Sequence, residues 1–159
     1  MYYSNFYYNN LKILVRCLPN FLKPDFVISR ITKIDKSYIK ELKSKYNIEG
    51  IILDVDNTLR KDMRPIPLYI KQWLEELIKE VKVIVVSNGY DNNIANYLKS
   101  IDIKYIPLAN KPMKKGLLKA IQELNIEANK ILVIGDSVID DVLGGKRCKT
   151  KTCLVSRLR

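Results

Sequence analysis

The sequence predicts an α/β protein with a mostly parallel sheet that is covered by helices on both faces. From residue 50 onward, short continuous apolar runs alternate with amphipathic stretches of helical spacing. Continuous apolar runs are typical of strands buried on both sides, and their alternation with helices is typical of a parallel sheet. A chain of 159 residues is most simply one domain.

Five apolar runs have the length of strands. They are residues 50–56, 81–87, 104–107, 130–136 and 151–155. Most are followed by turn residues or by acids, which is where a buried strand would reach the surface of the sheet.

The stretches between these runs predict helices. Residues 68–80 place apolar side chains three and four positions apart, as one face of a helix requires. A second helix should follow Asp91, which is a good N-cap residue. A third should begin near Lys111 and Pro112, since proline suits the first turn of a helix. We expect a last short helix to end at the glycine pair 144–145.

Residues 1–49 have a different character, because apolar and basic residues are mixed and prolines interrupt them. We expect a single domain over residues 1–159, in which 1–49 form a basic and apolar extension that packs on or flanks the core 50–156. An amphipathic arm that contacts lipid is the alternative interpretation.

Composition excludes several classes of site. The chain has no histidine, which rules out Ser-His-Asp and Cys-His catalysis and histidine-ligated metals. Its three cysteines form no CxxC pair, so neither a disulfide framework nor a four-cysteine zinc site is expected. No apolar stretch approaches the ~20 residues of a membrane span. A cytoplasmic protein is the default expectation.

The net charge of +11 is concentrated at the two ends of the chain. Residues 1–50 carry nine Lys or Arg against four Asp or Glu, and residues 141–159 carry six against one. Residues 51–140 are nearly balanced, with thirteen against twelve. This distribution favours an anionic partner, either a lipid surface or a nucleic acid, although the lysine-rich composition by itself accounts for part of it.

The polar motifs converge on one edge of the predicted sheet. Crossovers between parallel strands are right-handed, so all strand C-termini lie on the same edge, where ligands bind in open α/β sheets. Five polar side chains follow expected strands and should meet there: Asp54, Asp56, Ser87, Lys111 and Asp136.

These residue types suit phosphoryl transfer. If the first strand continues, Asp54 and Asp56 share a face, and a hard cation such as Mg²⁺ would relieve their repulsion. Asp136 is a natural third acid. Lys111 and the hydroxyl of Ser87 could neutralise and bind a phosphate, and an aspartate can act as the nucleophile.

Four segments resemble the motifs of the haloacid dehalogenase (HAD) superfamily in their usual order. "DVDNT" (54–58) resembles the first motif, DxDxT, and "VVSN" (85–88) the second. The lysine of "NKPM" (110–113) resembles the third, and "VIGDSVIDD" (133–141) the fourth. The resemblance implies a Rossmannoid three-layer α/β/α sandwich and a Mg²⁺-dependent phosphatase.

The resemblance also implies roles for the residues of the first motif. Asp54 would be the nucleophile and a metal ligand. Asp56 would be the general acid and base, with its main-chain carbonyl on the metal. Thr58 would help to shape the turn.

The remaining motifs supply the other expected site residues. Ser87, Asn88 and Lys111 would hold the phosphoryl group, and Asp136 would be a metal ligand. Asp141 would lie behind the metal ligands. Because Asp140 directly precedes it, either residue could be the last acid of the fourth motif, and we favour Asp141.

Longer segments are similar to HAD subfamily IIIA, the YqeG-type branch, which includes phosphatidylglycerophosphate phosphatases of mitochondria and plastids. They are residues 18–35, 111–126 and 133–147, and the likeness extends over roughly 18 to 155. Asp140 departs from it, since relatives more often carry Thr there.

No cap domain fits between the motifs. Eight residues separate Thr58 from Pro67, and 23 separate Ser87 from Lys111. A capless site suits a phosphate carried on something large. Together with the missing cap, the resemblance to the YqeG-type branch implies hydrolysis of phosphatidylglycerophosphate, with the chain cytoplasmic or peripheral on the inner face of the membrane. A phosphatase of a soluble metabolite or phosphoprotein is one alternative. A basic adaptor that binds RNA or ribosomes without catalysis is another.

Overall fold

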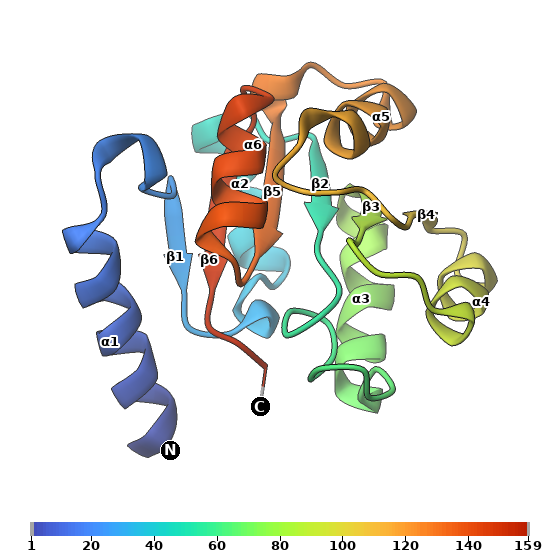
Figure 1. Cartoon of the computed structure of the whole chain (residues 1–159). Helices are drawn as coiled ribbons and strands as arrows, with labels where there is room; N and C mark the ends of the chain where they lie inside the picture. The colour runs from blue at the N-terminus through green and yellow to red at the C-terminus, as the bar shows by residue number, and fades with distance from the viewer. Residues whose placement is uncertain (1, 159) are drawn as a thin grey trace.

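A computed structural model describes the backbone of residues 2–158 and the side chains of residues 9–158. It has one six-stranded parallel sheet with the order β1-β6-β5-β2-β3-β4, between two layers of helices (Figure 1). The strands are β1 (Phe26–Ile28), β2 (Gly50–Leu53), β3 (Lys82–Val86), β4 (Lys104–Ile106), β5 (Ile131–Gly135) and β6 (Lys151–Val155). The predicted fold class is confirmed.

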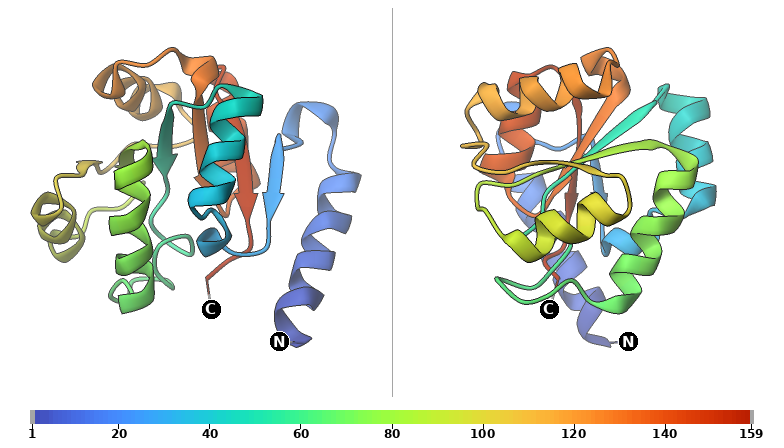
Figure 2. Two further views of the ribbon diagram at one scale, coloured as in Figure 1. Left: turned by 180° about the vertical axis from the view of Figure 1, so that it is seen from behind. Right: turned by 90° about the vertical axis from the view of Figure 1, so that its right-hand side faces the viewer.

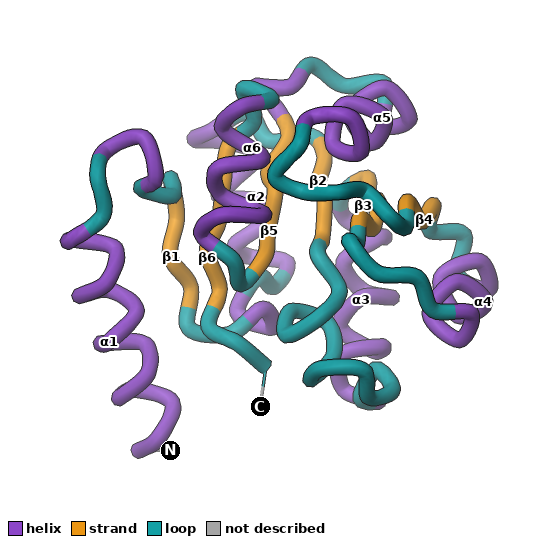
Figure 3. Tube along the Cα trace, in the orientation of Figure 1, coloured by secondary structure: helices purple, strands orange, loops and turns teal. Residues whose placement is uncertain are grey.

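Helices fill the connections between the strands (Figure 3). The α-helices are α1 (Tyr2–Cys17), α2 (Lys36–Tyr46), α3 (Leu68–Glu80), α4 (Asn92–Ser100), α5 (Lys114–Leu124) and α6 (Gly144–Arg147). Three short 3-10 turns are η1 (Asn20–Leu22), η2 (Ile31–Lys33) and η3 (Ala128–Lys130), and η4 (Val138–Leu143) is a π-helical segment that continues into α6.

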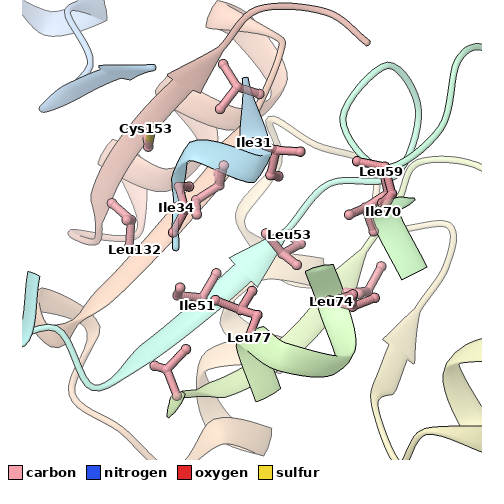
Figure 4. Packing of buried hydrophobic residues seen from close by; sticks show 14 of the residues in the cluster. Ile31, Ile34, Ile51, Leu53, Leu59, Ile70, Leu74, Leu77, Leu132 and Cys153 are labelled. Carbon is pink, nitrogen blue, oxygen red and sulfur yellow. The ribbon is translucent and has the colours of Figure 1, made fainter. Parts of the chain in front are cut away.

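The two faces of the sheet bury separate hydrophobic layers. Because side chains alternate along a strand, Ile51 and Leu53 of β2 join the layer of α2 and α3, whereas Ile52 joins the layer of α5. Figure 4 shows the first layer, with Leu74 and Leu77 of α3 beside Ile51 and Leu53. Every residue of β2 is buried, which fixes the central strand that leads into the site.

The N-terminal segment contributes a strand and core residues, a feature that the sequence analysis did not predict. Phe26 lies opposite Cys153 and Ile28 opposite Val155, so β1 forms an edge of the sheet beside β6. Asp25 supports this edge, because its carboxylate accepts hydrogen bonds from the main chain and the hydroxyl of Thr152, both at 2.9 Å. The same segment also contributes apolar side chains to the core. The buried ones are Ile28, Ile31, Ile34, Ile39, Leu42 and Ile48.

Helix α1 lies outside this packing. It runs beside β1 at the edge of the sheet, and its first turns extend beyond the C-terminal ends of the strands (Figures 1 and 2). Ile13 and Leu14 of α1 and Phe21 of η1 are 57%, 50% and 66% exposed. Among the described residues, no helix is both long and apolar enough to cross a bilayer.

Three local expectations require correction. The strand expected at 50–56 ends at Leu53, because the chain turns immediately into the first motif. Helix α5 begins at Lys114, after a turn in which Met113 N donates to Asn110 O, so Pro112 precedes the helix. The glycine pair 144–145 does not end a helix either, since α6 continues to Arg147.

The glycine at position 145 has a packing role instead. A Cβ there would lie 2.7 Å from Thr152 Cγ2 and 2.9 Å from Thr150 Oγ1. The residue therefore allows α6 to approach β6 closely.

Candidate active site

The predicted site residues gather at the edge where the parallel strands end, the edge at which the described chain also ends (Figure 1). Asp54 follows β2, Ser87 follows β3 and Asp136 follows β5. Lys111 reaches the same edge from the turn before α5, and Asp141 reaches it from η4.

The two acids of the first motif point to different partners. Because β2 ends at Leu53, Asp54 and Asp56 do not continue along one strand. The carboxylate of Asp54 accepts from Lys111 Nζ at 2.6 Å, whereas that of Asp56 accepts from Arg60 Nε at 2.7 Å. The strand on which a shared face was expected therefore stops before the two acids, and each acid has its own cation.

Lys111 is buried between two carboxylates. Its Nζ lies 2.6 Å from Asp54 Oδ1 and 2.6 Å from Asp141 Oδ1, and the three side chains are 3%, 12% and 2% exposed. Burial disfavours the ammonium ion, but the two carboxylates outweigh it and raise the pKa of Lys111. The lysine is therefore a fixed positive charge.

Gly135 makes this arrangement possible. A Cβ on Gly135 would lie 2.0 Å from Asp141 Oδ2 and 2.1 Å from its Cγ. The same Oδ2 accepts from the main-chain N–H of Ser137 at 3.1 Å, which fixes the carboxylate beneath β5. The glycine of the fourth motif thus makes room for the acid of that motif.

Three carboxylates could hold a metal ion. Asp54, Asp136 and Asp141 each offer an oxygen atom, and these atoms lie within 4.8 Å of one another. Burial and the charge of Asp141 raise the pKa of Asp54 to about 7, although Lys111 opposes the shift. Lys111 and Arg157 supply two positive charges against the three carboxylates. An oxygen-rich, electron-rich cluster of this kind fits a hard divalent cation.

Asp136 has a further partner at the protein surface. Arg157 Nε donates to Asp136 Oδ2 at 2.7 Å, and the arginine side chain is 69% exposed while that of the acid is 7% exposed. Burial and Asp141 raise the pKa of Asp136, and Arg157 partly offsets them. The C-terminal segment that carries Arg157 is held by a hydrogen bond that Leu158 N donates to Asn57 O.

The fourth motif contains two adjacent acids, and they differ in position. Asp141 is 1% exposed and contacts Lys111. Asp140 is half-buried and is absent from the cluster of three carboxylates. The favoured residue, Asp141, thus lies among the expected metal ligands themselves rather than behind them.

The second motif forms a compact turn after β3. Ser87 is 3% exposed, and its Oγ accepts from Gly89 N at 3.1 Å. The side chain of Asn88 is bonded to the main chain of Lys111, accepting from its N–H at 2.6 Å and donating to its carbonyl at 3.0 Å. A contact of Asn88 with phosphate would therefore come from its main chain, while its side chain positions Lys111.

Thr58, the last residue of the first motif, is buried. The residue is 1% exposed, and its Oγ1 has no hydrogen-bond partner among the described residues. Its main-chain N–H donates to Val55 O at 3.3 Å, in the turn that follows Asp54.

Two arginines of the site were missed by the sequence analysis. Arg60 is 3% exposed and bridges Asp56 to Asp91, with Nη1 2.5 Å from Asp91 Oδ2. Arg157 contacts Asp136 from the C-terminal tail. The position of Arg60 directly after the first motif was a signal that could have identified it, whereas nothing local in the sequence marks Arg157.

Comparison with known proteins identifies the family of the chain. A sequence model of haloacid dehalogenase-like hydrolases matches residues 61–149. The protein named "Probable phosphatase YqeG" from Bacillus subtilis (strain 168) is 36% identical over 141 residues, which cover 87% of this chain and 79% of that protein.

Solved structures share the fold at low sequence identity. The cobalt-bound deoxy-D-mannose-octulosonate 8-phosphate phosphatase of Haemophilus influenzae has a TM-score of 0.51 and 17% identity, and 69% of each chain is covered. The 2-haloacid dehalogenase of Pseudomonas syringae has a TM-score of 0.54 and 12% identity, with 67% of this chain and 86% of that chain covered. The matching sequence model and the 36% identical relative show that the chain belongs to the haloacid dehalogenase-like hydrolase family, which confirms both the resemblance and the enzyme class predicted from its motifs.

Proposed function

We propose that the protein is a Mg²⁺-dependent phosphatase that cleaves a phosphomonoester through an aspartyl-phosphate intermediate, with phosphatidylglycerophosphate as its substrate. The observation that carries the catalytic part is the cluster of Asp54, Asp136 and Asp141 at the edge of the sheet, with a buried lysine between Asp54 and Asp141. The chain has no histidine, so these carboxylates and Lys111 are the groups available for the chemistry.

Asp54 is the proposed nucleophile. Its carboxylate attacks phosphorus, a new O–P bond forms to Asp54, and the bond from phosphorus to the substrate oxygen breaks. Asp56 gives a proton to the departing oxygen and later takes one from the water that attacks the aspartyl-phosphate. That second step releases inorganic phosphate and restores Asp54.

The other residues support this chemistry by charge and position. Lys111 lies 2.6 Å from Asp54 Oδ1, so a phosphoryl group on Asp54 would be next to a fixed positive charge. Asp54, Asp136 and the main-chain carbonyl of Asp56 would hold Mg²⁺, with Asp141 close by. When bound, the ion would keep Asp54 ionised and neutralise the charge of the phosphoryl oxygens.

The surroundings of the site support a substrate with an apolar part. A cavity of about 450 Å³ adjoins Asp136 and Arg157 and lies between η4 and α1. Its apolar wall includes Leu11 and Leu14 of α1 and Ile139 of η4, and Leu14 and Ile139 are each 50% exposed. A lipid whose head group reaches Asp54 could place its glycerol and proximal acyl carbons in this cavity.

The positive charge of the segment that contains α1 supports binding to an anionic bilayer, from which the enzyme would take its lipid substrate. Residues 1–24 contain two lysines, one arginine and no acid. Each basic residue near an anionic membrane contributes roughly 1 kcal/mol of attraction. The first turns of α1 extend past the strand ends, so a bilayer that contacts α1 also faces the site (Figure 2).

The test measures Mg²⁺-dependent release of phosphate from phosphatidylglycerophosphate in mixed micelles, beside a panel of soluble phosphomonoesters. We expect the lipid to have the highest kcat/KM, and Asp54→Asn to lose activity on every substrate. High activity on soluble substrates with none on the lipid would contradict the lipid proposal. Full activity of Asp54→Asn would contradict the nucleophile.

A pair of variants on α1 tests the cavity. Leu14→Gln changes a residue of its wall, and Ile13→Gln changes a neighbour of similar exposure that is not part of the wall. We expect a roughly threefold to tenfold rise in KM for the lipid with Leu14→Gln alone, because the loss of apolar contact costs about 1 kcal/mol. Equal effects of the two changes would indicate general membrane attraction instead.

A further inference from the structure

We propose that Arg60 is a positioning residue that holds the carboxylate of Asp56 in the orientation needed for proton transfer. The inference rests on the proposed function, because it assumes that Asp56 is the general acid. It concerns a residue outside the four motifs, and its evidence is the set of contacts around one buried guanidinium group.

The guanidinium group of Arg60 is desolvated and bridges two carboxylates. The arginine side chain is 4% exposed, with Nε 2.7 Å from Asp56 Oδ1 and Nη1 2.5 Å from Asp91 Oδ2. Nη2 lies 3.4 Å from Met63 Sδ. All three nitrogen atoms of the guanidinium group therefore have a partner, so the plane of the group has a defined orientation.

Asp91 anchors this plane to a rigid element. Its other oxygen, Oδ1, accepts from the main-chain N–H groups of Asn93 at 2.8 Å and Ile94 at 3.3 Å, as the N-cap of α4. The positive end of the helix and the arginine thus share one carboxylate. Through it, the position of Asp56 is tied to α4 rather than to its own loop alone.

The loop that carries both partners is closed by its own main chain. The N–H groups of Thr58, Leu59 and Arg60 all donate to Val55 O, at 3.3, 2.8 and 3.2 Å. This tight turn returns Arg60 to the side of Asp56, four residues earlier. The arrangement therefore depends on local geometry that the first motif already imposes.

The second oxygen of Asp56 is directed toward the turn of the second motif. A Cβ built on Gly89 would lie 3.9 Å from Asp56 Oδ2 and 3.8 Å from Ser87 Oγ. The carboxylate oxygen Oδ2 and the hydroxyl of Ser87 therefore border the same space beside this glycine. Arg60 binds Oδ1 and leaves Oδ2 facing that space. The Asp56 side chain is 33% exposed, so without the arginine it would be free to rotate toward solvent.

A displaced general acid has a specific chemical signature. Departure of an alkoxide requires a proton, whereas departure of p-nitrophenolate, a weakly basic group, does not. Loss of the acid's position should therefore slow the cleavage of alkyl phosphates far more than the cleavage of p-nitrophenyl phosphate. A general loss of folded protein would slow both equally.

The experiment compares single-turnover release of the leaving group from glycerol phosphate and from p-nitrophenyl phosphate. For Arg60→Met we expect a loss of roughly 10- to 100-fold with the alkyl phosphate and of less than about 3-fold with the aryl phosphate. Arg60→Lys should recover part of the alkyl rate because it retains one charged donor. Arg64→Met is the matched control, since Arg64 is an exposed arginine of the same loop.

Each outcome has a definite meaning. Equal losses on both substrates for Arg60→Met would show a merely structural role and overturn the inference. If Asp56→Asn discriminates between the substrates and Arg60→Met does not, the inference fails while the proposed function stands. If Asp56→Asn does not discriminate, the proposed role of Asp56 fails.

A second variant covers the case in which Arg60→Met does not fold. Asp91→Asn retains an N-cap residue for α4 but removes the charge that orients Arg60. We expect it to show the same preference for the aryl substrate, with a smaller loss on the alkyl substrate. A uniform effect of Asp91→Asn on both substrates would contradict the inference.

Discussion

The site contains two buried cations, each placed between two carboxylates, and they differ in the kind of control they provide. Lys111 is a compact ammonium ion between Asp54 and Asp141, at the side of the site where a metal would bind. Arg60 is a planar group between Asp56 and Asp91, at the side of the second motif. A point charge suits a partner that must be shared with a phosphoryl group, whereas a fork of donors suits a partner that must keep one orientation.

The difference in burial between the two clusters should appear in stability. The acids beside Lys111 are 12% and 2% exposed, whereas those beside Arg60 are 33% and 17% exposed. Removing a buried cation leaves its carboxylates unpaired, and the cost increases as water is excluded.

Lys111→Met should therefore have the largest effect. In metal-free buffer at neutral pH we expect it to lower the free energy of unfolding by about 3–5 kcal/mol, against about 1–3 kcal/mol for Arg60→Met. Urea denaturation of both variants at the same pH measures the difference. A smaller decrease in the free energy of unfolding for Lys111→Met than for Arg60→Met would contradict this difference between the two clusters. Phosphatase activity of Lys111→Met should also fall by at least about 100-fold.

The pH dependence of stability should come chiefly from the Lys111 cluster. The pKa of Asp54 is about 7 in the folded protein against an ordinary value of 3.8. Between these values the folded state holds a proton that the unfolded state has lost, so stability falls as pH rises through this window. Raised pKa values of Asp136 and Asp140 act in the same direction.

We expect the free energy of unfolding of the metal-free protein to decrease by about 2–4 kcal/mol between pH 5 and pH 8. Asp54→Asn should remove most of this slope. Millimolar Mg²⁺ should oppose it, because the ion binds the ionised acids and stabilises the folded state at the higher pH. A metal-free protein that becomes more stable from pH 5 to pH 8 would contradict the assignment.

The smallest effect is expected for Arg157, whose side chain is 69% exposed although that of its partner Asp136 is only 7% exposed. Arg157→Ala should change the free energy of unfolding by about 0–1 kcal/mol, because the cation of this pair is solvated and its charge is screened. It should tighten Mg²⁺ binding by roughly twofold to fivefold, since a positive charge next to a ligand is removed. Calorimetric titration with Mg²⁺ measures this change, and weaker binding would indicate that Arg157 instead holds Asp136 in place.

The sequence predicted the core of the fold because its strands are continuous apolar runs followed by turn residues or acids. The runs at 81–87, 104–107, 130–136 and 151–155 correspond to β3, β4, β5 and β6, with ends that differ by no more than one residue. The cap of α4 was also confirmed, since Asp91 accepts from two main-chain N–H groups of its first turn. In each case the signal is local and agrees with the final packing.

Features that depend on distant partners were not predicted. β1 has only three residues, preceded by a proline and an aspartate, and its pairing partner is more than a hundred residues away. Arg157 likewise meets Asp136 only because β6 returns the tail to the site. The different cation partners of Asp54 and Asp56 could not be read from their spacing either, because β2 ends before both acids.

The sheet order has a consequence for synthesis of the chain. Of the six described strands β1 leaves the ribosome first, but its neighbour in the sheet is β6, which follows the other five. The four strands between them in sequence can pair before β6 emerges, so the edge that β1 forms is completed only after β6 has left the ribosome. Until then the apolar residues of β1, and α1 ahead of it, remain open to chaperones. A chain truncated before Lys151 should therefore retain most of its sheet while its first 28 residues become sensitive to protease.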